Sequence, residues 1–338
     1  MTDAPLAVVA RGLTKRYGPV LALDRLDLDV PPGVVFGLLG PNGAGKTTTI
    51  RLLTGLATPT AGHVSVTGLE VGSRNDTQAE LHRRIGVLDQ EPRYYGWMTG
   101  RELLVFVGEL LGIEARDLKS RTAETLERVG LTDAAGRRLS TYSSGMRQRL
   151  GIGQAILGRP KLLILDEPVS SLDPEGRRDL LTLIADLREV STVILSSHVL
   201  SDVERVCERV AILDHGRLVT EAAVSELLDE FAPPAYRVEV DPGQEPGIRL
   251  LVESLGRQRW AGRVEVEGHS LRVHVTDPDA AAMRLVPLLG TSGLRFSLIE
   301  RERPTLEDVF LELTGGTSAD EQAHDTGAAA NATGEAAS

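Results

Sequence analysis

The chain has 338 residues, with 37 Lys and Arg against 48 Asp and Glu, so its formal net charge is −11. This length suggests two domains, and the acidic balance argues against a general nucleic-acid binder, which would carry a basic excess. The single cysteine excludes an internal disulfide and a cysteine-based zinc site, and the sequence has no apolar run of the ~18 residues that cross a bilayer. The N-terminus also lacks a signal-peptide pattern, so we expect a cytoplasmic protein.

The N-terminal part of the chain alternates predicted strands and helices. Leu21–Val30 alternates apolar with acidic residues toward its end, which predicts an edge strand with one solvent-exposed face. Val34–Leu39 is a continuous apolar run, as expected of a buried strand, and helical periodicity follows it over 47–56. Further on, Lys161–Leu165 and Thr192–Leu195 are apolar strands with a helical run between them, which predicts a parallel sheet.

A proline pair at 233–234 breaks this pattern and marks the predicted domain boundary. Residues 235–316 then follow the order β–α–β–β–α–β, which is the ferredoxin-like arrangement. Residues 304–314 are predicted to form a terminal helix, because four apolar side chains share one of its faces. They are Leu306, Val309, Phe310 and Leu313. Residues 317–338 carry no large apolar side chain and are predicted to form a disordered tail.

The segment from Gly40 to Thr47 has the complete phosphate-loop pattern G-x-x-x-x-G-K-[ST]. It lies after an apolar strand and before a helix, where glycines let successive backbone N–H groups turn toward one anion. Lys46 is expected to reach the β- and γ-phosphates of a nucleotide, and the Thr47 hydroxyl to ligate Mg²⁺. The predicted nucleotide-binding residues of this segment are Gly40, Pro41, Asn42, Gly43, Ala44, Gly45, Lys46, Thr47 and Thr48.

Two carboxylates follow the apolar run that ends at Leu165. Acids at the carboxyl end of such a strand lie at the edge of an α/β sheet where ligands bind. We expect Asp166 to be an outer-shell partner of Mg²⁺, and Glu167 to be the base that orients or deprotonates the attacking water. Two acids after a strand also occur as a plain helix cap, but the phosphate loop upstream favours the functional interpretation.

These motifs resemble those of the ATP-binding cassette (ABC) ATPases, the nucleotide-binding subunits of ABC transporters, over about residues 6–230. The resemblance implies that Tyr17 stacks on adenine and that Gln90 senses Mg²⁺ and the lytic water. It also implies that Asp173 lies in a loop that crosses to a partner subunit, and that His198 contacts the γ-phosphate. Each of these residues alone fits a plain structural role, whereas their common order along the chain favours the family interpretation.

One segment departs from the family pattern. The family carries Leu-Ser-Gly-Gly-Gln at the start of a helix, where this chain has Tyr142-Ser143-Ser144-Gly145-Met146. The retained residues offer a hydroxyl, backbone N–H groups and a positive helix end to the γ-phosphate held by the other subunit. This form resembles the variant of drug-exporting members, and the segment 304–315 resembles the end of the daunorubicin-resistance type of exporter ATPase. The signature residues assigned to ATP are Ser143, Ser144 and Gly145.

The resemblance implies a fold and a domain order. A P-loop α/β core with an antiparallel β lobe and a helical lobe, at about residues 91–158, would make up the cassette at 1–231. A small α+β domain at 235–316 would follow, with a regulatory or dimer-stabilising role.

The resemblance also implies an activity and partners. It implies ATP hydrolysis with Mg²⁺ by a homodimer, docked from the cytoplasm on a separately encoded membrane permease, with no nucleic acid as partner. Tyr94, Tyr95 and Trp97 suggest a contact surface for a permease helix. Drug or antibiotic efflux is the first hypothesis, and export of a lipid, polysaccharide or ion is the alternative. ABC ATPases of the ribosome or of chromosomes are disfavoured, because they would need a second cassette or a long coiled coil.

Overall fold

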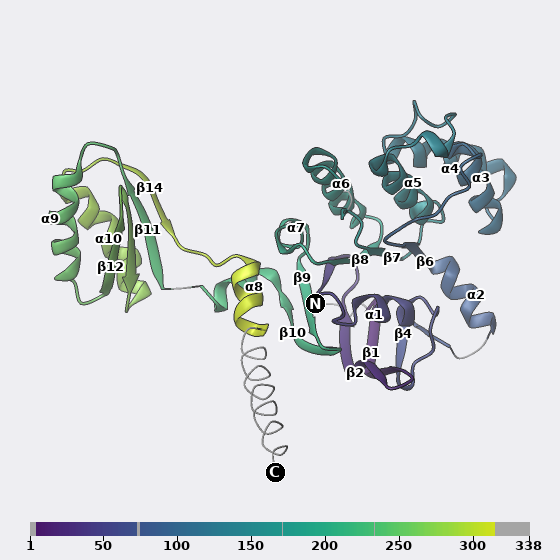
Figure 1. The fold of residues 1–338 in the computed structure, drawn as a ribbon, viewed down its shortest axis with the longest axis horizontal. Helices are drawn as coiled ribbons and strands as arrows, with labels where there is room; N and C mark the ends of the chain where they lie inside the picture. The colour runs from purple at the N-terminus through teal and green to yellow at the C-terminus, as the bar shows by residue number, and fades with distance from the viewer. Residues whose placement is uncertain (1–4, 73–74, 171, 233, 315–338) are drawn as a thin grey trace, which may run out of the picture. The chain divides into compact units, whose positions relative to one another are not determined.

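The computed structural model describes residues 5–72, 75–170, 172–232 and 234–314, which form two compact units (Figure 1). Among the described residues, the first unit contains those up to Val224 together with 310–314, and the second contains those within Ser225–Val309. The contacts therefore divide the chain at Val224, before the predicted break at 233–234. Residue 233 itself lies outside the described residues. The predicted tail at 317–338 also lies outside them.

An antiparallel β lobe forms at the N-terminal end of the first unit, as predicted. Its strand order is β2-β1-β4-β5, so β2 lies at the edge of this sheet. In β2 the side chains of Leu26 and Leu28 are buried and that of Asp27 between them is exposed, which confirms the predicted edge strand with one solvent-exposed face. The strands are β1 (Val8–Tyr17), β2 (Val20–Val30), β4 (Ala61–Val66) and β5 (Leu69–Glu70).

A six-stranded sheet of order β10-β9-β3-β8-β7-β6 forms the core of the first unit. All pairs are parallel except that of β10 with β9, and every residue of β3, β7 and β8 is buried. This arrangement confirms the predicted parallel sheet. The strands are β3 (Val35–Leu39), β6 (Ile85–Leu88), β7 (Leu162–Asp166), β8 (Thr192–Ser197), β9 (Arg209–Asp214) and β10 (Arg217–Ala223).

Helices join these strands and build the predicted helical lobe. The strand β6 and the helix α2 before it were not predicted, because Leu81 is the only large apolar residue of that helix. In the lobe, α3 begins with a reciprocal capping box between Thr99 and Glu102. The helices are α1 (Lys46–Leu53), α2 (Asn75–Arg84), α3 (Gly100–Leu110), α4 (Ala115–Arg128), α5 (Ser144–Ile156), α6 (Pro174–Leu187) and α7 (Leu200–Val206). A 3₁₀ turn, η1 (Leu139–Thr141), precedes α5.

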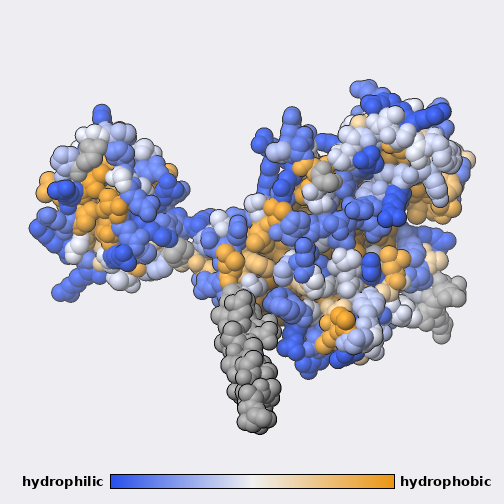
Figure 2. All heavy atoms as spheres, viewed as in Figure 1, coloured by the Kyte–Doolittle hydropathy of each residue, from blue (hydrophilic) through white to orange (hydrophobic). Residues whose placement is uncertain are grey.

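The second unit has the ferredoxin-like order predicted from its sequence. Its antiparallel sheet, β12-β13-β11-β14, buries Trp260, Leu271 and Leu285 in a core of its own. The elements are α8 (Val224–Glu230), β11 (Ala235–Val240), α9 (Glu245–Gly256), β12 (Ala261–Glu267), β13 (Ser270–Val275), α10 (Pro278–Thr291) and β14 (Phe296–Arg301). On the face seen in Figure 2, hydrophilic residues cover most of each unit.

The predicted terminal helix is present over residues 306–314. Leu306 and Val309 are completely buried, whereas Leu311 on another face is 60% exposed. Thr305 and Asp308 cap its start reciprocally, and the backbone N–H of Thr305 holds the pKa of the Asp308 carboxyl below its ordinary value. Among the residues that the structure describes, none of the helices combines the length and the apolar character that a membrane span requires.

Candidate active site

The phosphate loop connects β3 to α1 in a backbone conformation that depends on glycine. Gly45 has a φ of 104°, and a Cβ there would lie 2.7 Å from Leu23 Cδ2 and 2.9 Å from the carbonyl oxygen of Ala22. Gly43 has a φ of 87° and no heavy atom within 4 Å of the position of a Cβ, so its backbone faces open space. No side chain caps the start of α1. The first N–H groups of this helix are therefore available to an anion.

A cavity of about 270 Å³ lies against this loop and gathers most of the predicted site residues. Gln90 reaches it from the segment after β6, and His198 from the segment after β8. The predicted site residues that line the cavity are Pro41, Asn42, Gly43, Gly45, Lys46, Thr47, Thr48, Gln90, Asp166, Glu167 and His198. Ala22, which the motifs did not indicate, completes the wall. Gly40 and Ala44 belong to the loop but are buried behind it.

The ammonium group of Lys46 is buried in the loop. Its Nζ donates to the carbonyl oxygens of Gly40 at 2.6 Å and Pro41 at 3.1 Å, and only 7% of the residue is exposed. Burial lowers the pKa of Lys46 below its ordinary value, while the neighbouring carboxylates of Glu167 and Asp166 act in the opposite direction. A nucleotide phosphate in the cavity would supply further negative charge to this buried cation.

Asp166 stands at the centre of a short hydrogen-bond network. The Thr47 hydroxyl donates to Asp166 Oδ2 at 3.4 Å, and the Ser196 hydroxyl donates to Asp166 Oδ1 at 2.5 Å. The backbone N–H of Glu167 donates to Ser196 Oγ at 2.9 Å. The fully buried Ser196 therefore positions both acids, and no motif pointed to it. Its signal in the sequence was a polar residue directly after the apolar run Thr192–Leu195.

The oxygen atoms at this point suit a magnesium ion. The Thr47 hydroxyl and the Asp166 carboxylate are hard oxygen donors within hydrogen-bond distance of each other. Nowhere in the described part of the chain do three or more His, Cys, Asp or Glu side chains group as metal ligands. Mg²⁺ is ordinarily held by one or two protein oxygens together with substrate phosphates and water, so two donors beside a phosphate loop fit this ion.

Glu167 is held close to His198 at the mouth of the cavity. His198 Nδ1 lies 2.7 Å from Glu167 Oε2, and 7% of Glu167 is exposed. The backbone of Glu167 has a φ of 48°, in the left-handed region that residues other than glycine rarely adopt. Such a conformation costs of order 1 kcal/mol and is found most often at functional sites. The pair therefore presents a buried carboxylate and an imidazole, in direct contact, to the same cavity.

The loop that carries Gln90 is tied to the signature helix α5. The side-chain amide of Gln148 donates to the carbonyl oxygen of Gln90 at 3.4 Å, and the Tyr94 hydroxyl donates to that of Arg147 at 3.2 Å. Burial raises the pKa of Tyr94, so its hydroxyl stays protonated and remains a donor. A movement of α5 would therefore be passed to Gln90, which lines the cavity.

The signature segment forms the start of α5 and does not line the cavity. Ser143 caps the helix by accepting from the N–H of Met146 at 3.2 Å, and Tyr142 is buried with its hydroxyl donating to the carbonyl oxygen of Ala134. A Cβ on Gly145 would lie 3.5 Å from Leu172 Cδ2, so the segment before α6 is adjacent. There Asp173 caps α6 in the same way, accepting from Gly176 N at 2.9 Å.

Tyr17 lies at the end of β1 and does not line the cavity. The residue is 43% exposed, and Lys15 Nζ lies 4.9 Å from the centre of its ring. A partly exposed aromatic ring at this point can stack on a base. The role of Tyr17 as the adenine platform remains a prediction.

We expect Tyr17→Ala to weaken ATP binding, because the lost stacking is worth about 0.5–1.5 kcal/mol. Tyr17→Phe and Tyr17→Trp keep an aromatic face and should bind as the parent does. The measurement is a titration with a fluorescent ATP analogue. Tyr236→Ala, in the second unit, is a matched control and should leave binding unchanged. An alanine variant at position 17 with parental affinity would assign this ring a purely structural role.

Comparisons with known proteins agree with this geometry. Residues 23–170 match the protein family described as ABC transporter. The daunorubicin/doxorubicin resistance ATP-binding protein DrrA of Streptomyces peucetius is 37% identical over 317 residues, which cover 93% of this chain and 94% of the relative. The Nod factor export ATP-binding protein I of Rhizobium sp. (strain N33) is 35% identical over 311 residues, which cover 92% of this chain and 97% of the relative.

Solved structures share the fold of the first unit. A dimeric post-hydrolysis structure of the ATP-binding cassette MJ0796 bound to ADP and Pi superimposes with a TM-score of 0.59. The match has 22% sequence identity and covers 64% of this chain and 98% of that cassette. At this identity the likeness establishes the fold.

Proposed function

The chain belongs to the ABC transporter family of ATP-binding subunits, and from this premise we propose that it drives efflux of a drug or antibiotic through a separately encoded permease. As a member of this family it is the ATP-hydrolysing motor subunit of a transporter. The observation that supports a drug as the exported substrate is the 37% identity to a daunorubicin/doxorubicin resistance protein over 93% of this chain. The Nod factor export relative, at 35% identity, favours an export substrate other than a drug as the second candidate.

The residues of the cavity divide the work of hydrolysis. The loop N–H groups and Lys46 hold the phosphates, Glu167 accepts the proton of the attacking water, and His198 contacts the γ-phosphate. Thr47, Gln90 and Asp166 would hold Mg²⁺, which when bound neutralises phosphate charge. Ser196 holds the carboxylate of Asp166 and the backbone N–H of Glu167 through its two hydrogen bonds.

A homodimer would complete each nucleotide site. Ser143, Ser144 and Gly145 lie at a helix start that does not line the cavity of their own chain. In a head-to-tail pair, this helix start would meet the γ-phosphate bound by the other copy, with Asp173 close to the contact. ABC ATP-binding subunits dimerise, and the solved MJ0796 cassette is itself a dimer. The exposure of Ser143, Ser144 and Asp173 supports this arrangement.

An exposed aromatic pair offers a surface for the permease. Tyr95 is 60% and Trp97 is 70% exposed, and their ring centres lie 6.0 Å apart. Aromatic side chains in such a position favour a protein contact. Tyr94, the third residue of the predicted surface, turns its hydroxyl toward α5 instead. Docking here would place the chain peripherally on the inner face of the membrane and would couple the permease to the loop of Gln90.

The test of this function measures export in cells that express the chain together with a separately encoded permease that co-purifies with it. Cells with the parent chain should accumulate less daunorubicin than cells with the inactive Glu167→Gln variant, because efflux needs hydrolysis. Equal accumulation for daunorubicin and for a panel of other drugs would contradict drug efflux and leave the second candidate.

We expect the C-terminal domain to affect coupling rather than nucleotide binding. Residues 235–316 contain no phosphate loop or paired strand-end acids. A chain that ends at residue 231 should therefore bind ATP normally but dimerise weakly with ATP, or lose export in cells. A chain that ends at residue 316 should match full length in every respect. The measurements are ATP affinity, the dimer fraction with ATP, and co-purification of the permease.

A fourth chain separates the domain from the terminal helix. The contacts group residues 310–314 with the first unit, so the 1–231 chain lacks part of that unit. Replacing 235–303 by a Gly/Ser linker keeps the helix at 306–314 and removes only the ferredoxin-like domain. Normal dimerisation and permease binding by both the 1–231 chain and the linker chain would refute a regulatory role for the domain.

A further inference from the structure

A second cavity lies at the amino ends of the strands of the six-stranded sheet, whereas the phosphate loop lies at their carboxyl ends. It encloses about 310 Å³ and is lined by α4, by the end of α5 and by the turns before β7 and β8. Those turns lie at the amino ends of the two strands, whereas Asp166 and His198 lie at their carboxyl ends. The described residues that line it are all different from those around the phosphate loop, so it forms a separate site.

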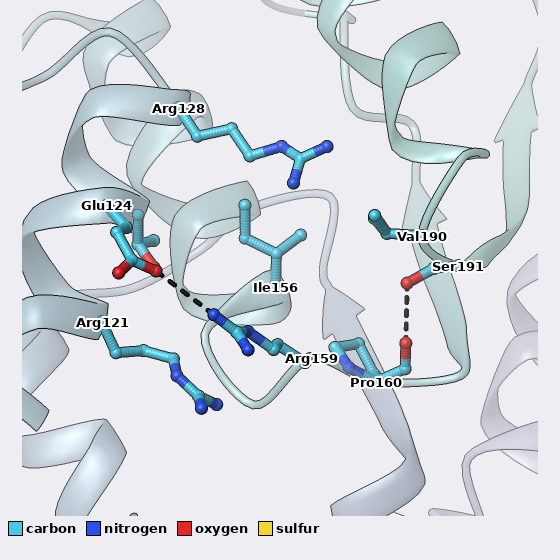
Figure 3. A pocket seen from close by; sticks show the side chains of 9 residues that line it. Arg121, Glu124, Arg128, Ile156, Arg159, Pro160, Val190 and Ser191 are labelled. Atoms are coloured by element: carbon cyan, nitrogen blue, oxygen red, sulfur yellow. Dashed lines mark hydrogen bonds and ion pairs between the residues drawn. The ribbon is translucent and has the colours of Figure 1, made fainter. Parts of the chain in front are cut away.

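Three arginines and one carboxylate surround this cavity among the described residues. Arg159 Nη2 lies 3.3 Å from Glu124 Oε2, which pairs these two side chains. Arg121 and Arg128 flank Glu124 on the same face of α4, and neither forms an ion pair or side-chain hydrogen bond within the described chain. Figure 3 shows both side chains extending from α4 beside the hollow. The cavity therefore carries surplus positive charge in a chain of net charge −11.

Apolar surface forms the other side of the cavity (Figure 3). Ile156 and Pro160 contribute to it, and the aliphatic side chain of Val190 is open to solvent, with 59% of the residue exposed. The Ser191 hydroxyl donates to the carbonyl oxygen of Pro160 at 2.7 Å, so these two polar groups already satisfy each other. A ligand would therefore meet guanidinium donors on one side and hydrocarbon on the other.

The backbone at Arg159 is a further feature that favours a ligand site in this cavity. This residue follows α5 with a φ of 51°, in the left-handed conformation where glycine is usual, and its N–H donates to the carbonyl oxygen of Ile156 at 2.9 Å. Arginine is disfavoured in this conformation relative to glycine. The position nevertheless carries a guanidinium that lines the cavity.

We propose that this cavity binds a small organic phosphate monoester, with its phosphate on Arg121 and Arg128 and its apolar body on Ile156 and Val190. Guanidinium groups match phosphate oxygens through paired N–H donors. The surplus of two positive charges balances a phosphate monoester, which carries about −1.5 to −2 charges at pH 7. Because the ligand contacts both the helical lobe and the turn before β8, its binding stabilises one arrangement of these two lobes.

Phenyl phosphate is the probe, and calorimetry on the full chain measures its binding. A non-hydrolysable ATP analogue with Mg²⁺ first saturates the phosphate loop, so the probe reports on the second cavity. The double variant Arg121→Gln/Arg128→Gln should bind at least about tenfold more weakly, because it loses two charge-assisted hydrogen-bonding partners. The matched control Arg101→Gln/Lys119→Gln removes two exposed positive charges of the helical lobe outside the cavity and should bind as the parent does.

A second variant and a second probe complete the test. Val190→Asp places a negative charge at an exposed wall position and should also weaken phenyl phosphate at least about tenfold. Inorganic phosphate, which has no apolar body, should bind more weakly than phenyl phosphate. The proposal is overturned if millimolar phenyl phosphate does not bind the parent, or if the Arg121/Arg128 and Val190 variants bind it as tightly as the parent. Equal affinity for both probes overturns the assigned role of the apolar wall.

Discussion

The Glu167→Gln variant should bind ATP but hydrolyse it at least ~100-fold more slowly than the parent, within the range expected for the loss of a general base. Glutamine keeps the shape and hydrogen-bonding reach of the buried side chain beside His198, but it cannot take the proton of the attacking water. Hydrolysis is measured as phosphate release at saturating ATP, and binding by titration with a fluorescent analogue. Because ATP binds but is not consumed, the variant should accumulate as an ATP-bound dimer on gel filtration.

The matched control for this experiment is Glu175→Gln. Glu175 lies exposed in the first turn of α6, close in sequence but outside the cavity, and its variant should hydrolyse ATP at the parental rate. Near-normal phosphate release by Glu167→Gln would contradict the assignment of Glu167 as the general base. In that case the strained backbone at Glu167 would have a structural explanation only.

Replacing Lys46 with alanine should weaken ATP binding at least about 100-fold, since a charge-assisted hydrogen bond is worth about 1.5–3 kcal/mol and this ammonium can form more than one with phosphates. The Lys46 ammonium donates to the carbonyl oxygens of Gly40 and Pro41 in its own loop. We expect these donors to turn to the phosphates of a bound nucleotide. Affinity is measured by the same titration, and circular dichroism checks the fold.

Lys161→Ala provides the control for Lys46. Lys161 is an exposed lysine that precedes β7 in the same unit, so its loss changes the net charge equally without touching the cavity. Its variant should bind ATP as the parent does. If Lys46→Ala binds ATP within a factor of about three of the parent while remaining folded, the loop does not hold the phosphates through this residue.

The sequence by itself determined the elements whose signal is local. The phosphate loop, the strand that ends in Asp166 and Glu167, and the helix over 306–314 were each visible because neighbouring residues carry the whole pattern. The ferredoxin-like order of the second unit was visible for the same reason, since each short apolar run is bounded by a turn. The helix α2 was missed because a polar helix with one large apolar residue has no periodicity to detect.

The tertiary structure decided which distant residues meet. Ser196 joins Asp166 and Glu167 only because β8 lies beside β7, and strand neighbours in a parallel sheet are not encoded in any local pattern. The arginines of the second cavity come from α4 and from the turn after α5, so their shared charge was invisible along the chain. Motifs record what one segment can bind, whereas a site between segments depends on long-range packing, which is why the phosphate loop could be predicted from the sequence and the second cavity could not.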